Sequence, residues 1–105
     1  MEKVIRDGKV AVLYSEGFGA GWSTWNEGMK ELIFHPKVVD MVLEGRQNEI
    51  DEDWAAENLG EEYAYIYCGG VDNLKIEWLP IGTKFFITVY DGAEDVITED
   101  SFLEA

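Results

Sequence analysis

The chemistry that this sequence suggests first is anion binding by a glycine-rich loop. Gly17, Gly19 and Gly21 stand at alternate positions, and Thr24 follows them at the predicted start of a helix. Glycines let backbone amides approach a phosphate, and a helix start carries a positive partial charge. The loop lacks the spacing of dinucleotide-binding and P-loop motifs, however, and contains no Lys or Arg. Binding of a nucleotide or another small molecule by residues 17–24 is therefore an alternative function, not the preferred one.

The aromatic residues of the same loop allow two further interpretations. The glycines permit a sharp connection that lets Trp22 and Trp25 fold over the edge of a sheet. Exposed aromatic side chains beside flexible backbone also make good anchors for a partner protein. The two can coexist if one tryptophan is buried and the other exposed. The candidate ligand or partner loop comprises Gly17, Phe18, Gly19, Gly21, Trp22, Thr24 and Trp25.

Side chains with catalytic or metal-binding potential are present, but none has the partners that the chemistry needs. Asp51, Glu52 and Asp53 are consecutive and lack an apolar pocket that would separate their pKa values. The stretch around them also lacks the ligand spacing of a calcium loop. His35 has no Cys or His at ligand spacing, and Cys68 has no nearby histidine. The sequence thus predicts no catalytic residue, no metal site, no cofactor and no enzymatic activity.

The net charge of −14 in 105 residues disfavours direct contact with nucleic acid or with an anionic membrane. The charge is concentrated in two segments. Residues 44–62 carry one base, Arg46, against the acids Glu44, Glu49, Asp51, Glu52, Asp53, Glu57, Glu61 and Glu62. Residues 91–105 carry no base against Asp91, Glu94, Asp95, Glu99, Asp100 and Glu104. The negative field therefore belongs to these two segments, not to the whole surface.

The first half of the chain predicts a strand followed by two or three helices. The apolar run Val10–Tyr14 is typical of a central strand covered on both faces, and Asp7-Gly8 is a turn signal before it. Residues 3–6 are either a short edge strand or only a lead-in to this turn. Thr24 and Glu27 match a capping box, so a helix is expected from residue 25 until Pro36 ends it. A second helix is expected at 37–43, and a third at 51–58.

The second half predicts strands. The segment 63–68 is rich in residues that favour strands, 74–79 alternates apolar and polar residues, and 84–91 is followed by the turn Asp91-Gly92 and a strand at 94–98. The expected fold class is α+β: one N-terminal strand, two to three helices, then an antiparallel meander of three to four strands. We expect residues 1–105 to form one domain, with a loose lead-in at 1–8 and a loose tail at 99–105.

The cellular compartment is predicted from the absence of targeting and membrane-spanning patterns and from the cysteine content. No apolar run approaches the ~20 residues that cross a bilayer, and the first residues do not resemble a signal peptide. A single cysteine fits a reducing compartment. The expected location is the cytosol.

Three stretches of the chain, taken together, resemble a family. They are VAVLYSEGFGAGWSTWN at 10–26, FHPKVVDMVLEG at 34–45 and CGGVDNLKIEWLPIGTKFFITVYDGAEDV at 68–96. The chain resembles small acidic proteins encoded by phages and prophages, over roughly residues 9–98. That family has no established activity, so the resemblance implies a context, the cytosol of a bacterial host, and assigns no functional residues.

These observations lead to a hypothesis of non-enzymatic binding. A small phage-type protein with surplus carboxylates can imitate the phosphates of DNA and occupy the basic surface of a host protein. A protein partner with a basic surface is expected, and a homo-oligomer is left open. A role in phage assembly or as a scaffold is a further alternative. The candidate acidic partner face comprises Glu49, Asp51, Glu52, Asp53, Glu57, Asp91, Glu94 and Asp95.

Overall fold

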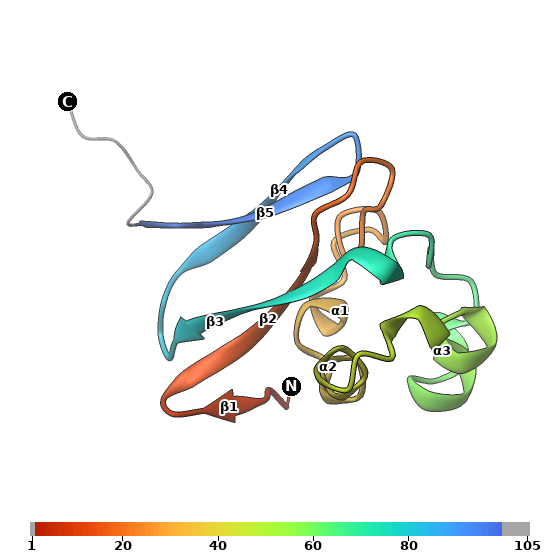
Figure 1. Cartoon of the computed structure of the whole chain (residues 1–105), viewed down its shortest axis with the longest axis horizontal. Helices are drawn as coiled ribbons and strands as arrows, with labels where there is room; N and C mark the ends of the chain where they lie inside the picture. The colour runs from red at the N-terminus through yellow and green to blue at the C-terminus, as the bar shows by residue number, and fades with distance from the viewer. Residues whose placement is uncertain (1, 100–105) are drawn as a thin grey trace.

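Strand β2 (Lys9–Ser15) is the centre of a three-stranded antiparallel sheet in this computed structural model, which describes residues 2–99. The short strand β1 (Ile5–Arg6) pairs with one edge of β2, and β3 (Leu74–Pro80) pairs with the other (Figure 1). Successive residues of β2 point to opposite faces, yet Ala11, Val12 and Leu13 are all buried. The prediction of a central strand covered on both faces is confirmed.

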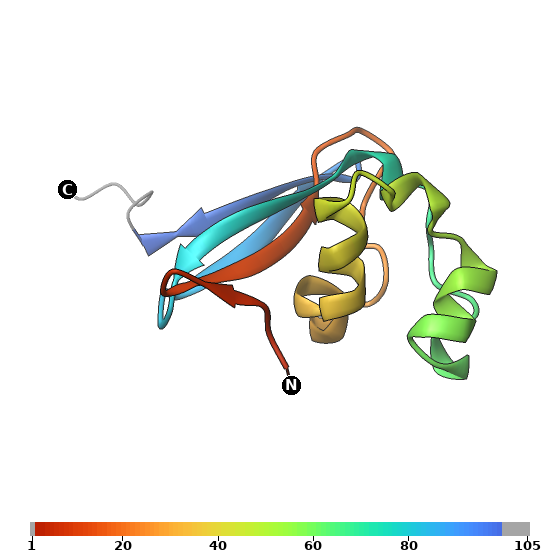
Figure 2. The same ribbon diagram turned by 60° about the horizontal axis from the view of Figure 1, so that its bottom comes forward.

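Three short helices lie on one side of this sheet (Figure 2). They are α1 (Lys30–Phe34), α2 (Pro36–Leu43) and α3 (Glu52–Asn58). Pro36 occupies the first turn of α2, and the carboxylate of Asp51 accepts a hydrogen bond from the amide of Trp54 at the start of α3 (2.7 Å). The second and third predicted helices are therefore confirmed, the third with the N-cap that the sequence indicates. No helix in the described part of the chain has the length and apolar character needed to cross a membrane.

The predicted start of the first helix is wrong. Residues 25–28 form turns, and both Glu27 (φ 62°) and Gly28 (φ 66°) have left-handed backbone conformations that a continuous helix excludes. Helix α1 begins only at Lys30. The hydroxyl of Thr24 does not cap a helix but donates a hydrogen bond to the distant carboxylate of Glu94. A long-range contact has replaced the local capping box.

The predicted strand at 63–68 is also wrong. A 3₁₀ turn covers Glu61–Tyr63, and the chain then continues in an irregular conformation. The buried residues of this segment are Tyr63 and Ile66, whose separation of three residues fits a turn and does not fit the alternation of a strand. Tyr65 and Tyr67 are left exposed.

The last two strands form a hairpin of their own. Strands β4 (Phe85–Tyr90) and β5 (Ala93–Thr98) are joined by Asp91-Gly92, where both residues have positive φ (48° and 86°), as a tight two-residue hairpin turn requires. The hairpin is separate from the three-stranded sheet, because β3 pairs with β2 and not with β4. The last strands are antiparallel as expected, but the predicted continuous meander is wrong, since the N-terminal strand β2 takes the place beside β3. Strand β5 packs against β2.

The expected α+β fold class is confirmed, with an N-terminal strand, helices and then antiparallel strands forming one compact body. The predicted lead-in at 1–8 contributes β1 and its turn, in which Asp7 and Gly8 both have positive φ. The predicted tail at 99–105 lies outside the described residues apart from Glu99.

Candidate functional site

The glycine-rich loop forms a tightly packed connection between β2 and the helices. Gly19 has a positive φ of 71°, and a side chain on Gly21 would collide with the ring of Trp25, since an added Cβ would lie 2.4 Å from it. Trp22 is fully buried, and its indole Nε1 donates a hydrogen bond to the carbonyl of Leu32 (2.6 Å). Trp25 is 42% exposed and Phe18 75% exposed. The loop therefore serves the core through Trp22 and presents the other two aromatic rings to solvent.

Backbone amides near this loop do bind an anion, but the anion belongs to the chain itself. The carboxylate of Glu94, at the start of β5, accepts hydrogen bonds from the amides of Ser15 (2.9 Å), Trp22 (2.9 Å) and Thr24 (3.0 Å). The hydroxyl of Thr24 donates a fourth at 2.6 Å. Glu94 is only 1% exposed, so its assignment to an exposed acidic face is wrong. It joins the hairpin to the loop.

The tip of the hairpin reinforces this junction. The amide of Gly19 donates to the carbonyl of Asp91, and an added Cβ on Gly92 would lie 2.7 Å from the amide nitrogen of Ala20. A phosphate bound by the amides of Trp22 and Thr24 would have to displace Glu94. This geometry gives the nucleotide-binding alternative no support.

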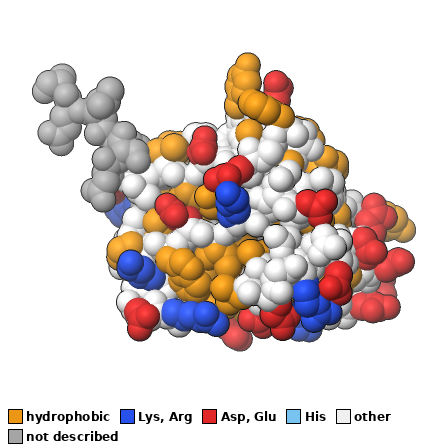
Figure 3. Space-filling view, viewed as in Figure 1, with side chains coloured by type: hydrophobic (Ala, Val, Ile, Leu, Met, Phe, Trp, Pro, Cys, Tyr) orange, Lys and Arg blue, Asp and Glu red, His pale blue; other side chains and the backbone are white. Residues whose placement is uncertain are grey.

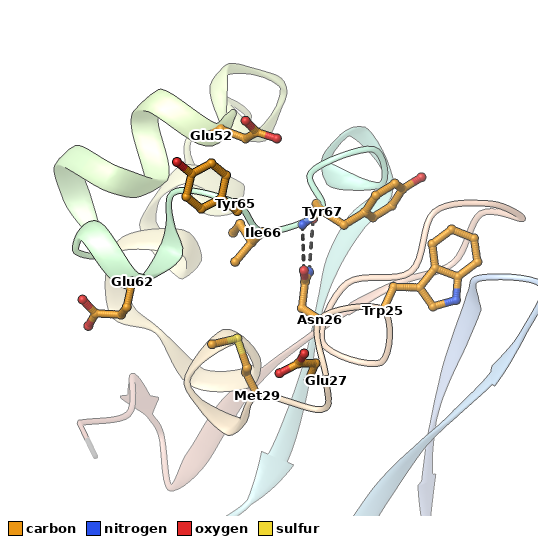
Figure 4. Close-up of a pocket in the computed structure, with 9 residues that line it drawn as sticks. All are labelled: Trp25, Asn26, Glu27, Met29, Glu52, Glu62, Tyr65, Ile66 and Tyr67. Atoms are coloured by element: carbon orange, nitrogen blue, oxygen red, sulfur yellow. Dashed lines mark hydrogen bonds between the residues drawn. The ribbon is translucent and has the colours of Figure 1, made fainter.

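On the other side of Trp25, an asparagine side chain fixes the neighbouring irregular segment. The amide group of Asn26 accepts a hydrogen bond from the backbone N–H of Tyr67 (2.7 Å) and donates to its carbonyl (3.1 Å), as Figure 4 shows. The same side-chain nitrogen donates to the carbonyl of Trp22 (2.8 Å). The hydroxyl of Tyr67 donates to the carbonyl of Gly19 (2.5 Å). The rings of Tyr67 and Trp25 are thereby held with their centroids 5.1 Å apart.

A groove of about 470 Å³ opens beside this aromatic pair. Figure 4 shows its lining, to which the turn at 25–29, α3 and the segment 62–67 all contribute. The side chain of Tyr65 is 92% exposed on the groove. The lining residues are Trp25, Asn26, Glu27, Met29, Glu52, Glu62, Tyr65, Ile66 and Tyr67. The groove thus combines three exposed aromatic rings with three carboxylates, and no Lys or Arg lines it.

A second hollow continues the groove along the start of α3. It is lined by Asp51, Glu52, Asp53, Ile66, Tyr67, Cys68 and Gly69, and shares Glu52, Ile66 and Tyr67 with the first. The structure therefore joins two candidates that are separate in the sequence, Trp25 of the loop and the acidic residues 51–53. Figure 3 shows acidic side chains gathered around α3 and the segment that follows it.

The remaining candidate acids lie elsewhere or are partly neutralised. Glu49 accepts two hydrogen bonds from the guanidinium of Arg46 (both 2.9 Å), which lowers the pKa of its carboxyl. Glu57 is exposed on α3. Asp91 and Asp95 are exposed on the hairpin, which lies away from α3 in both ribbon views (Figures 1 and 2). The eight candidates do not form one continuous face.

The described His, Cys, Asp and Glu side chains do not gather into a metal site. Among residues 2–99, no three His, Cys, Asp or Glu side chains converge in a way that could hold a metal ion. Burial, followed by repulsion from Glu52 and Asp51, raises the pKa of the Cys68 thiol to about 11, so the thiol is protonated at neutral pH. Burial lowers the pKa of His35, whose Nδ1 accepts a hydrogen bond from the amide of Lys37 at the start of α2. Cys68 and His35 fit structural positions.

Comparison with family models, with curated proteins and with solved structures found no match for this chain. The resemblance to small phage-encoded proteins stays a hypothesis. The sequence does not predict the parts that Asn26, Tyr65 and Tyr67 play in the groove, nor that Glu94 is a buried hydrogen-bond acceptor. Only the tyrosines have a local signal, the three-residue spacing of the apolar residues Tyr63 and Ile66, which in a turn leaves Tyr65 and Tyr67 exposed.

Proposed function

We propose that this protein acts by binding a basic segment of a partner protein, and that the groove between Trp25, Tyr65 and α3 receives an arginine or lysine side chain of that partner. The observation that carries the proposal is the composition of the groove, which places exposed aromatic rings beside Glu27, Glu52 and Glu62 without a neutralising base. The binding is non-enzymatic.

The physical basis is the attraction of a cation to both kinds of group. A cation over an aromatic face gains about 0.5–2 kcal/mol, depending on how far it is desolvated, and guanidinium groups also stack on aromatic rings. The chain already uses such contacts internally, since the Nζ of Lys3 lies 4.5 Å from the ring centroid of Phe34 and the guanidinium of Arg6 lies 5.8 Å from that of Trp78. The net charge of −14 would steer a basic partner toward the protein.

The class of partner that we propose is a nucleic-acid-binding protein of the bacterial host. Two features support this choice: the exposed carboxylates around α3, namely Asp51, Glu52, Asp53 and Glu57, and the resemblance to small phage-encoded proteins. Carboxylates on an exposed helix can take the place of DNA phosphates on a basic surface. In this proposal the protein is an inhibitor that occupies such a surface.

The groove can be tested with a peptide before the partner is known. The probe is an acetylated tetra-arginine peptide, with tetra-citrulline as the uncharged control of the same shape, and binding is followed by calorimetry and tryptophan fluorescence. We expect the arginine peptide to bind and the citrulline peptide not to bind. Equal responses to the two peptides would contradict the proposal.

A matched pair of double variants separates the groove from general charge. Glu52→Gln with Glu62→Gln removes two charges from the groove, and Asp72→Asn with Glu77→Gln removes two exposed charges outside it. Losing two exposed contacts worth about 0.5–1 kcal/mol each should weaken binding about 5–30-fold. The control pair should change affinity by less than about threefold, since distant charges are screened. Equal weakening by both pairs would show that only net charge matters and would overturn the groove assignment.

The partner itself would be sought by capture from host lysate at about 20 mM and about 150 mM salt, followed by mass spectrometry. The proposal expects a basic nucleic-acid-binding protein that the wild-type chain retains at low salt and the Glu52/Glu62 variant does not. Retention of the same protein by both chains would refute the role of the groove.

A further inference from the structure

The outer edge of β4 is an unpaired strand edge within the described part of the chain. The hairpin contains only β4 and β5, so β4 is paired on one side. The residues that close the two-residue turn, Tyr90 and Ala93, are a hydrogen-bonded pair in this turn type, and every second residue then repeats the pattern. The amides of Ile87 and Val89 therefore point away from β5. Neither amide donates a backbone hydrogen bond to a described residue outside the hairpin.

The side chains along this strand are suited to strand pairing. The sequence of β4 is FFITVY, which has high β-propensity and contains no charge, no proline and no glycine. Natural proteins usually protect such an edge with charged residues, proline or a bulge. Here the nearest charges lie just outside the strand, Lys84 at one end and Asp91 at the other. Within residues 2–99 no strand pairs with this edge, and β4 itself lacks the usual protection.

We propose that the outer edge of β4 binds the same edge of a second copy of this chain, forming an antiparallel four-stranded sheet across a two-fold axis. Such an interface is self-complementary, because each copy supplies the identical strand. The only symmetric register that pairs all of the outward-facing backbone groups of Phe85, Ile87 and Val89 sets Ile87 opposite its own counterpart. Phe85 then lies opposite Val89 of the other copy.

Charge complementarity favours a second copy as the occupant of this edge. In that register Lys84 of one copy lies opposite Tyr90 of the other and therefore next to its Asp91, and the same contact repeats at the other end. Lys84 has no ion pair among the described residues. A basic partner would instead be attracted to the carboxylates around α3, since β4 carries no charge. The inference is independent of the proposed function.

The first experiment measures mass and amide exchange as a function of protein concentration. The interface is one strand wide and smaller than the ~1,200 Å² of a standard interface, so a weak dimer is expected at the concentrations used for NMR. The exchange of the Ile87 and Val89 amides should slow at least about threefold as the dimer forms. A monomer at all concentrations would overturn the proposal. Protection of these amides that does not change with concentration would also overturn it, because the edge would then be covered within one chain.

Two variants test the geometry of pairing. Val89→Pro removes an outward N–H without touching the hydrogen bonds to β5, and Val89→Thr is the control that keeps the N–H. Lys84→Glu, which stays clear of the core, should weaken the dimer at least about fivefold by facing Asp91 with a like charge, whereas Lys30→Glu should not. Val89→Pro should be monomeric and still bind the arginine peptide. A dimer that persists in both Val89→Pro and Lys84→Glu would place the interface elsewhere and refute the inference.

Discussion

Replacing Glu94 with glutamine tests the claim that an internal carboxylate holds the glycine-rich loop to the hairpin. One carboxylate oxygen accepts three hydrogen bonds, from the amides of Trp22 and Thr24 and from the Thr24 hydroxyl, and the other accepts one from the amide of Ser15. Glutamine has one oxygen and one NH₂ group, so in either orientation at least one buried donor faces another donor. The substitution keeps the shape of the side chain and removes the acceptor that the site needs.

The expected loss in the free energy of unfolding follows from the four hydrogen bonds that Glu94 accepts. In the better orientation the glutamine oxygen faces the three donors, and the amide of Ser15 is left without an acceptor, at about 1–3 kcal/mol. The three remaining bonds lose the extra strength of a charged acceptor, about 1 kcal/mol each. The lower cost of burying a neutral amide offsets part of this loss. We expect a net loss of about 2–4 kcal/mol, a large fraction of the 5–15 kcal/mol typical of a folded domain.

The assay is urea unfolding followed by tryptophan fluorescence and, separately, by far-ultraviolet circular dichroism. The control is Asp95→Asn, which changes the same charge at the next residue of β5, where the side chain is exposed, and should cost less than about 0.5 kcal/mol. A loss below about 1 kcal/mol for Glu94→Gln, or an equal loss for Asp95→Asn, would refute the account of Glu94 as the central acceptor.

Three further predictions concern the groove and the two titrating side chains. Tyr65→Ala should weaken the arginine peptide about 3–10-fold in the same calorimetric assay and leave stability within about 0.5 kcal/mol, because the ring is almost fully exposed. Cys68, with a pKa of about 11, should react with iodoacetamide at pH 8 about two orders of magnitude more slowly than free cysteine. In urea, where the chain is unfolded, it should react at the rate of free cysteine. A fast reaction of the folded protein would contradict the protonated thiol. The pKa of His35 lies below 6.5 in the folded protein, so the unfolded chain binds its proton more readily. The stability that neutral His35 contributes should therefore be lost as pH falls through 6.5 toward the lower pKa of the folded protein. The urea midpoints of the wild type and His35→Gln, measured across this pH range, test this. The same pH dependence in both proteins would contradict the lowered pKa.

The parts of the fold that the sequence predicts correctly are those with a local physical cause. The turns Asp7-Gly8 and Asp91-Gly92 contain residues that tolerate positive φ, and both have it. Asp51 precedes α3 and caps it, and Pro36 opens α2 because its missing amide costs nothing there. Runs of apolar and β-branched residues gave β2, β3 and β4. None of these requires knowledge of a distant residue.

The errors arise where a distant residue decides the local conformation. Thr24 and Glu27 have the pattern of a capping box, but the hydroxyl of Thr24 binds a carboxylate 70 residues away. The segment at 63–68 has strand propensity, but the backbone of Tyr67 pairs with the side chain of Asn26, 41 residues away, and not with another strand. The sequence predicts an exposed position for Glu94, as for any acidic residue, whereas the side chain is buried. Nothing in the sequence around Glu94 indicates that distant backbone amides surround it.

The same distant contacts decide where binding can take place. Glu94 satisfies the amides around the glycine-rich loop, so the feature that most resembles an anion site has no free donors at Ser15, Trp22 or Thr24. Asn26 instead holds Tyr67 beside Trp25, and this pairing opens a groove whose charges come from α3 and the segment after it. The buried carboxylate of Glu94 lies on one side of Trp25, and the exposed carboxylates of the groove lie on the other. Both repel anionic ligands. The exposed charges of the groove are therefore all negative, which is why we propose a cationic side chain as its ligand.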